Sequence, residues 1–285
     1  MPSQTAQRRT ERRKSRQARL ADRQTRRRDR RRRGVRVREP SRQENPDRAE
    51  RAYEAALISM VDSLVAFALR SLTARVKALE PERADASDSR INAILVALRR
   101  KSGQIFTLRR MQALAEEMIG EVNDHNRDQI KRQLLQSIGV DISPEVSEAI
   151  ISGAVERNVA LIKSIPQKLL GQVEEVLEAG VLRGARAETL AGELEERLGV
   201  ARSRARLIAR DQVNKFNGEL AAQRQAAVGV TQYRWSTSRD ERVRDTHAAN
   251  EGQVFSWSSP PATGHPGEEI NCRCVPIPVF SDISI

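Results

Sequence analysis

The chain has 285 residues, of which 39% are hydrophobic, so it can build a core and is not disordered throughout. Aromatic residues are only 3%, whereas Ala, Leu, Glu and Arg are abundant, a composition typical of long helices rather than of a β-sandwich. We therefore predict a mainly α protein with an N-terminal disordered basic arm, long amphipathic helices and a small C-terminal α+β module.

The net charge of +12 belongs to the N-terminal arm. Residues 1–50 contain 19 of the 50 basic and 7 of the 38 acidic residues, so the rest of the chain is neutral. We predict that residues 1–45 are disordered when free, because like charges repel and there is little apolar surface to bury. The predicted partner is double-stranded DNA, bound without sequence preference through phosphate neutralisation; a solvated tail, a localisation signal and an organelle-targeting peptide are the alternatives. The candidate DNA-binding residues are Arg26, Arg27, Arg28, Arg30, Arg31, Arg32, Arg33, Arg36 and Arg38.

Residues 46–140 are predicted to form a helical assembly region. Apolar residues recur at helical spacing from Pro46 to about residue 79, then at about 88–101 and about 104–137. The most apolar window, residues 55–72, is interrupted by Asp62, which favours a buried helix of a soluble protein over a membrane span. Since no secretory signal opens the chain, we expect a protein made in a reducing cytoplasm.

The region 141–280 is predicted to be a separate domain, helical to about residue 228. Ser143 is placed to cap a helix with Pro144 in its first turn, and a further helix is expected from Pro166 to about Ala179. Gly199 is expected to end a helix that contains Leu190 and Leu194. A last helix at about 201–227 carries a polar strip that is either solvated or part of a structural network or an interface: Arg206, Arg210, Asn214 and Asn217.

Residues 229–280 have a different composition. Three short segments rich in aromatic or β-branched residues, 231–237, 253–257 and 274–280, are separated by Gly, Pro and Ser. This pattern predicts three strands of a small sheet.

Four side chains in this module are of the kinds that bind zinc. His247, His265, Cys272 and Cys274 match a closed tetrahedral site in residue type. Both cysteines of the chain lie in "NCRC", where a disulfide across one residue would be strained. From these residues alone, the alternative is two buried thiols acting as small apolar groups, with the histidines hydrogen-bonded or on the surface.

Residues 206–280 carry an ordered string of motifs: the "IAR" helix, "YRWSTSRDERVRDTH", a Gly before an aromatic strand, "PG" and "NCRCV". This string resembles the phage Mu protein F-like family, the minor head or head morphogenesis proteins of tailed double-stranded DNA bacteriophages; a looser resemblance extends back to about residue 150. The family's recurring positions fall on Arg210, Asp240, Arg242, Arg244, His247, Gly252, Pro266, Gly267, Cys272, Arg273 and Cys274.

The resemblance implies a structural, non-enzymatic role in the virion. It implies a protein built in few copies into the phage head near the portal, contacting the portal, capsid or scaffold protein, and present in the host cytoplasm during assembly. With this context we predict one structural zinc on the two histidines and two cysteines, and a structural polar cluster of Arg210, Asp240, Arg242, Arg244 and Arg273. In that cluster Arg273 points away from the metal and pairs with Asp240 or Asp245. No membrane and no small-molecule substrate are expected.

The competing hypothesis is a metal-dependent enzyme carried in the virion, of the nuclease or transferase type. "RDERVRDTH" brings Asp, Arg and His close together in sequence, as such an enzyme requires. Against it, four protein ligands would leave the zinc no open position for water.

Overall fold

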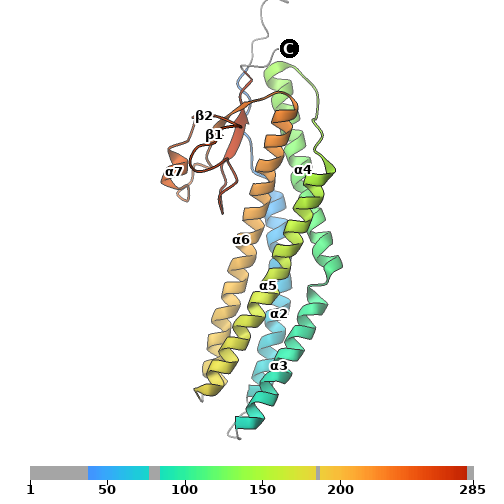
Figure 1. Cartoon of the computed structure of the whole chain (residues 1–285), viewed down its shortest axis with the longest axis vertical. Helices are drawn as coiled ribbons and strands as arrows, with labels where there is room; N and C mark the ends of the chain where they lie inside the picture. Colours follow the sequence, from blue (N-terminus) through green and yellow to red (C-terminus); the bar gives the residue numbers. More distant parts are fainter. Residues whose placement is uncertain (1–37, 77–83, 184–186, 281–285) are drawn as a thin grey trace, which may run out of the picture.

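The computed structural model describes residues 38–76, 84–183 and 187–280. These residues form a bundle of long helices and a small module of strands (Figure 1). The helices of the bundle are α2 (Asp47–Val76), α3 (Ala84–Ile105), α4 (Leu108–Ile138), α5 (Glu148–Leu182) and α6 (Ala187–Ala227). The module contains β1 (Gln232–Ser236), α7 (Asp245–Ala248), β2 (Val254–Ser256) and β3 (Val275–Pro278). The predicted fold class, mainly α with a small C-terminal α+β module, is confirmed.

Helix α6 is the central element of the bundle. It packs against α2, α4 and α5, and it also contacts β3 of the module. Its face toward the bundle is fully buried at Val213, Phe216 and Leu220, which recur at intervals of three and four residues. Burying each of these large side chains contributes roughly 1.5–3 kcal/mol, so this stripe fixes α6 in the bundle.

One apolar core runs through the bundle. It contains residues on both sides of the predicted domain boundary at residue 140, from Ala49 on α2 to Leu220 on α6. The helices of the predicted assembly region and of the predicted C-terminal domain therefore pack together, and the division at 140/141 does not separate two cores.

The start of α5 differs from the prediction. Ser143 and Pro144 do not begin a helix, because α5 starts at Glu148. The Pro144 carbonyl instead accepts a hydrogen bond from the Arg224 side chain at 3.2 Å, which holds this segment against α6 in an extended form.

Two predicted helix breaks are also wrong. Pro166 lies inside α5, and Gly199 lies inside α6, each within one continuous helix. Ile162 and Leu169 are buried on either side of Pro166, as are Leu194 and Ala201 around Gly199. Because tertiary packing on both sides offsets the unfavourable propensity, the helices continue through these residues.

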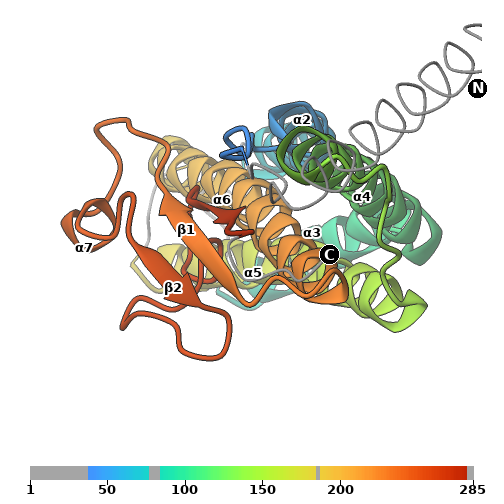
Figure 2. The ribbon, with the colours of Figure 1, turned by 90° about the horizontal axis from the view of Figure 1, so that it is seen from above.

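The three predicted strands are confirmed and form one antiparallel sheet in the order β2-β1-β3. The central strand β1 buries Tyr233 and Trp235 completely. Seen from above, the module lies to one side of the bundle, next to α6 (Figure 2). Its own core is small, with Phe255 and Trp257 packed against the two β1 aromatics and the two cysteines.

A loop of the module rests directly on α6. A Cβ atom at Gly218 would lie 2.6 Å from the Pro266 carbonyl oxygen. Gly267 has a φ of +92°, and a Cβ there would lie 2.9 Å from the Asn214 carbonyl oxygen. Glycine is required at both positions for this close approach, which gives a structural reason for the "PG" motif.

Residues 38–45, predicted to belong to the disordered arm, instead make specific contacts. Gln43 is buried, and the Gln133 side chain of α4 donates to the Ser41 carbonyl at 2.9 Å. The Arg42 guanidinium donates to the Thr237 carbonyl, and the Asn45 amide donates to the Arg273 carbonyl at 3.0 Å. These hydrogen bonds tie the segment between α4 and the module, so the sequence-based boundary of the arm is too late.

Helix α2 meets the length and composition criteria for a membrane span over Asp47–Ser71, with 39% of its most apolar stretch buried in the protein. A core helix meets the same criteria. Leu57, Val61 and Leu64 are completely buried against the rest of the bundle, as the prediction of a buried helix requires.

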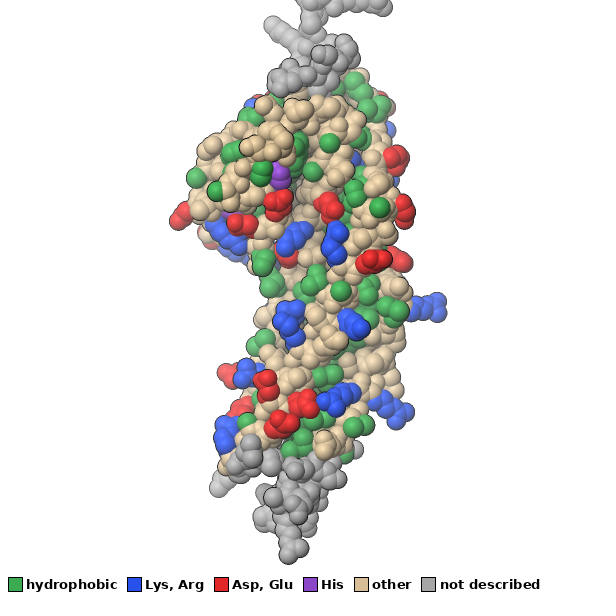
Figure 3. All heavy atoms as spheres, viewed as in Figure 1, with side chains coloured by type: hydrophobic (Ala, Val, Ile, Leu, Met, Phe, Trp, Pro, Cys, Tyr) green, Lys and Arg blue, Asp and Glu red, His purple; other side chains and the backbone are tan. Residues whose placement is uncertain are grey.

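The surface of the bundle carries charges of both signs. On the face drawn in Figure 3, basic and acidic side chains alternate along the length of the molecule. Several are paired across helices, for example Arg157 with Glu219 at 2.8 Å and Arg99 with Glu174 at 3.0 Å. This matches the neutral charge balance of residues 51–285.

Candidate metal centre

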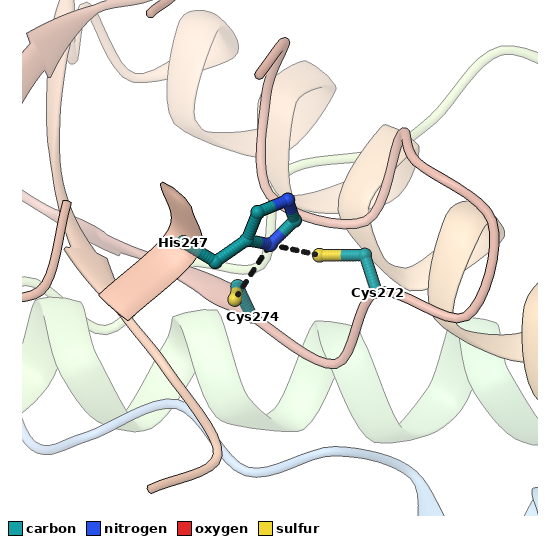
Figure 4. A group of neighbouring side chains, drawn as sticks. All are labelled: His247, Cys272 and Cys274. Carbon is teal, nitrogen blue, oxygen red and sulfur yellow. Dashed lines mark hydrogen bonds between the residues drawn. The ribbon is translucent and has the colours of Figure 1, made fainter. Parts of the chain in front are cut away.

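His247, Cys272 and Cys274 converge at one point of the module (Figure 4). One ligand atom from each lies within 4.8 Å of the other two, and all three residues are buried. The His247 Nδ1 atom lies 3.5 Å from the sulfur of Cys272 and 3.5 Å from that of Cys274. A tetrahedral zinc with Zn–S of about 2.3 Å and Zn–N of about 2.0 Å places N and S about 3.5 Å apart. The three donors therefore fit one metal ion.

Short local structures position each donor. His247 lies on the single-turn helix α7, whose start is held by the extended backbone of Arg244. Cys272 closes a turn in which its amide donates to the Glu269 carbonyl at 3.0 Å, and Cys274 directly precedes β3. Directly before Cys272, Asn271 has a φ of +62° and donates its amide to Asp211 of α6 at 3.0 Å. Helix α6 thus anchors the turn that presents both thiols.

The donors have the hydrogen-bonded surroundings that metal ligands need. The second nitrogen of His247, Nε2, lies 2.9 Å from a Glu269 carboxylate oxygen, which fixes Nδ1 as the nitrogen free to bind a metal. The Gly267 amide donates to the Cys272 sulfur at 3.4 Å. The edge of the Trp235 ring packs against His247, with 5.4 Å between ring centroids.

The two thiols are both free and interact with each other. A hydrogen bond from Cys274, with help from the Gly267 amide, lowers the pKa of Cys272. The same interaction, together with burial, raises the pKa of Cys274. Thiolate is the form that binds metal.

The predicted fourth ligand, His265, lies outside this group. Its Nδ1 atom is 2.9 Å from the Tyr233 hydroxyl, and its ring packs against Trp257 with 4.9 Å between centroids. The prediction of four protein ligands is therefore wrong in this structure. The loop that carries His265 lies close against α6 at Gly218 and Gly267, and it places the imidazole next to Tyr233, whereas His247 packs against Trp235.

The predicted polar cluster is brought together around the same point. Arg273 donates to Asp240 at 2.6 Å, one of its two predicted partners. Hydrogen bonds from Arg273 and from the Arg242 amide hold the pKa of Asp240 below its usual value despite desolvation, which acts in the opposite direction. Arg244 bonds Glu269 at 2.7 Å.

Arg210 joins this cluster to the bundle. It donates to Glu50 of α2 at 3.2 Å, and Asn214 donates to the second oxygen of the same carboxylate at 3.3 Å. Asn217, on the same strip of α6, accepts from Asn126 of α4 at 2.9 Å. The strip of Arg and Asn is therefore a structural network rather than a solvated face.

A cavity of about 210 Å³ opens beside the three donors. His247, Cys272 and Cys274 all line it, together with four arginines, Arg210, Arg242, Arg244 and Arg273. The sequence analysis named these arginines but gave no reason to expect a cavity among them.

Glu269 is the residue of this site that sequence reasoning missed. It is one of two adjacent glutamates just before "NCRC". A nearby carboxylate is a common partner of a metal-bound histidine, but nothing in the sequence distinguishes Glu269 from Glu268, whose carboxylate accepts the His265 amide instead.

Of the predicted DNA-binding residues, the structure describes Arg38. It is exposed, and its amide donates to the Ser137 carbonyl at the end of α4. The remaining eight, from Arg26 to Arg36, lie outside the described residues.

Comparison with known proteins supports the resemblance seen in the sequence. Residues 171–277 match the family described as phage Mu protein F like protein. The matched range includes all of α6, all of the sheet except the last residue of β3, and all three donors of the metal centre. This family suggests a phage head morphogenesis protein and a location in the virion, and it is consistent with a structural rather than an enzymatic role.

An uncharacterized protein of Haemophilus influenzae is 35% identical to this chain over 176 residues. The match covers 59% of this chain and 39% of the relative, so the chain spans well under half of that longer protein. No solved structure matches.

Proposed function

We propose that this chain is a minor head protein of a tailed bacteriophage, incorporated in few copies near the portal, whose basic arm contacts the packaged DNA. The observation that carries the proposal is the family match over residues 171–277, which contains the metal centre and the surrounding arginines. The charge of residues 1–50 supports the DNA contact independently, since a protein enclosed with DNA lies beside a high density of phosphate.

The proposed role of the bundle is assembly. Its elongated shape offers a long surface of mixed charge, and its apolar stripes are already buried in the protein's own core (Figure 3). A partner such as the portal, capsid or scaffold protein would therefore meet polar side chains and exposed single apolar residues, for example Leu108 and Val96.

The metal in this proposal is one zinc per chain, held by His247, Cys272 and Cys274. It would link α7 to the turn before β3, two segments 25 residues apart in sequence that few apolar contacts hold together. In a reducing cytoplasm a metal can supply this cross-link where a disulfide cannot.

DNA binding is tested with purified full-length protein and a shortened chain lacking residues 1–37, which keeps the contacts of residues 38–45. If six to ten arginines contact phosphates, affinity for duplex DNA falls roughly 10³- to 10⁵-fold between 50 and 200 mM salt. The shortened chain is expected to lose most binding. Salt-insensitive binding, or full binding by the shortened chain, would refute the role of the arm.

Incorporation is tested by mass spectrometry of purified virions, with copies of this chain counted relative to portal subunits. A few copies per portal support the proposal. If this protein is absent from virions whose heads still assemble normally, the proposed role in the head is contradicted.

A metal-dependent enzyme is the second candidate, and one observation favours it: three protein ligands leave a fourth position on the metal, as catalytic zinc sites do. Glu269, the carboxylate bonded to His247, is also bonded to Arg244, so it is poorly placed to act as a general base. Duplex DNA incubated with the zinc-loaded or magnesium-supplemented protein distinguishes the two candidates, because cleavage on a gel indicates an enzyme and retarded intact DNA indicates binding alone.

A further inference from the structure

The three donors of the metal centre all lie in the wall of the arginine-lined cavity. A metal shared by His247, Cys272 and Cys274 would therefore sit at the edge of this cavity. Zinc with three protein ligands completes its tetrahedron with a water or another exogenous ligand. Among the described residues that carry His, Cys, Asp or Glu side chains, no fourth belongs to this group. The remaining position must be filled from the cavity.

The chemistry of the cavity selects for an anion. Four arginines line it, and no carboxylate is among its lining residues in the described part of the chain. A zinc bound by two thiolates and one neutral histidine has no net charge, so the arginines determine the local potential. Guanidinium groups bind phosphate oxygens by paired, charge-assisted hydrogen bonds.

The arginines are not equally available. Arg210, Arg244 and Arg273 form hydrogen bonds with Glu50, Glu269 and Asp240, which are not among the lining residues. In contrast, the side chain of Arg242 has a single, long ion pair of 3.9 Å with the exposed Glu241, and it is 63% exposed itself. Arg242 is therefore the arginine with the most unused hydrogen-bonding capacity.

We propose that this cavity is a binding site for a phosphate-type oxyanion, which occupies the fourth position of the metal and is held by Arg242. The cavity of about 210 Å³ is far larger than the ~10–15 Å³ that a single water needs, so a tetrahedral oxyanion fits. The inference rests on the metal proposed above and adds its ligand. Free phosphate, a terminal phosphomonoester of DNA and a backbone phosphodiester share this chemistry.

The test uses full-length protein loaded with cobalt(II), whose visible spectrum reports the ligands of the metal. Inorganic phosphate is titrated at constant ionic strength, with chloride as the reference anion. We expect phosphate to change the cobalt bands saturably and chloride to leave them unchanged. A dinucleotide with a terminal phosphate and one with only the bridging diester then distinguish the two nucleic-acid sources.

Two variants make the test specific. Arg242→Gln keeps the three protein ligands but removes one charge-assisted contact, so phosphate affinity should fall about tenfold or more. Arg197→Gln replaces an exposed arginine of α6 that does not line the cavity, and phosphate affinity should remain as in the unchanged protein.

The outcomes separate this inference from the proposed metal site. Cobalt that binds at one ion per chain but does not respond to phosphate would overturn the oxyanion site and leave the metal site standing. Failure to bind cobalt or zinc would overturn both. Equal loss of phosphate affinity in Arg242→Gln and Arg197→Gln would show a general charge effect and would also overturn the proposal.

Discussion

The helical bundle and the C-terminal module are stabilised in different ways. The bundle has one continuous apolar core that extends over α2 to α6. The module buries two large aromatics, Tyr233 and Trp235, and otherwise depends on the two thiols, His247 and a network of arginines and carboxylates. Local damage should therefore have different consequences in the two regions. A cavity in the bundle lowers global stability, whereas loss of one metal donor in the module removes the link between α7 and the turn before β3.

The chain offers separate probes for the two regions. Both of its tryptophans, Trp235 and Trp257, lie in the module, so tryptophan fluorescence reports mainly the module and its contact with α6 at Gln225. Far-UV circular dichroism is dominated by the long helices and reports the bundle.

Cys272→Ser should have the largest effect. Removing one of three protein ligands is expected to abolish stoichiometric zinc binding, and the module should unfold locally while most helicity remains. Elemental analysis and tryptophan fluorescence measure the two effects. As a control, the unchanged protein stripped with a chelator should show the same fluorescence and recover when zinc is returned, which Cys272→Ser should not. Full zinc content in Cys272→Ser would show that the metal site is misassigned.

Leu64→Ala tests the bundle. Leu64 is completely buried, so truncation should lower the free energy of unfolding by about 2–5 kcal/mol. Urea unfolding followed by circular dichroism measures the change, and zinc content should not alter. Leu108→Ala is the control, since Leu108 is 59% exposed and its loss should change stability by no more than about 0.5 kcal/mol. Equal effects of the two substitutions would contradict the assignment of the core.

Glu269→Gln sharpens the assignment of the metal centre. The carboxylate orients His247 through Nε2, and loss of such a partner typically weakens metal binding about 10- to 100-fold. Competition with a zinc chelator measures the affinity. The neighbouring Glu268→Gln provides the matched control, because Glu268 contacts the His265 amide and should leave zinc affinity nearly unchanged. The reverse order of effects would exclude Glu269 from this role.

His265→Gln should have the smallest effect. It removes the contact with the Tyr233 hydroxyl, which is worth about 0.5–1.5 kcal/mol, and it should leave one zinc per chain. Unfolding monitored by tryptophan fluorescence gives the stability change, and elemental analysis gives the zinc content. Loss of zinc in this variant would show that His265 is a fourth ligand, which contradicts the three-donor assignment.

Much of the fold could be predicted because it depends on short-range patterns. The apolar residues of α2, α3 and α4 recur every three or four positions. The three strands lie in short segments rich in aromatic or β-branched residues, and turn residues separate these segments. The predicted helix breaks at Pro166 and Gly199 were wrong because they too were based on local patterns alone. Their local propensity breaks helices, but residues distant in sequence pack against both sides of each and keep α5 and α6 continuous.

The residue types in the sequence were enough to predict which side chains could bind a metal and that Arg273 would pair with Asp240 or Asp245. The three-dimensional packing was needed to show that His247 rather than His265 joins the thiols, that Glu269 bonds it, and that residues 38–45 contact the module. These outcomes depend on how the segment between His247 and Cys272 packs against α6, where Gly218 and Gly267 allow close backbone contact and Asp211 holds the turn at Asn271. Such paths are fixed by packing between distant segments, and no local pattern in the loops encodes them.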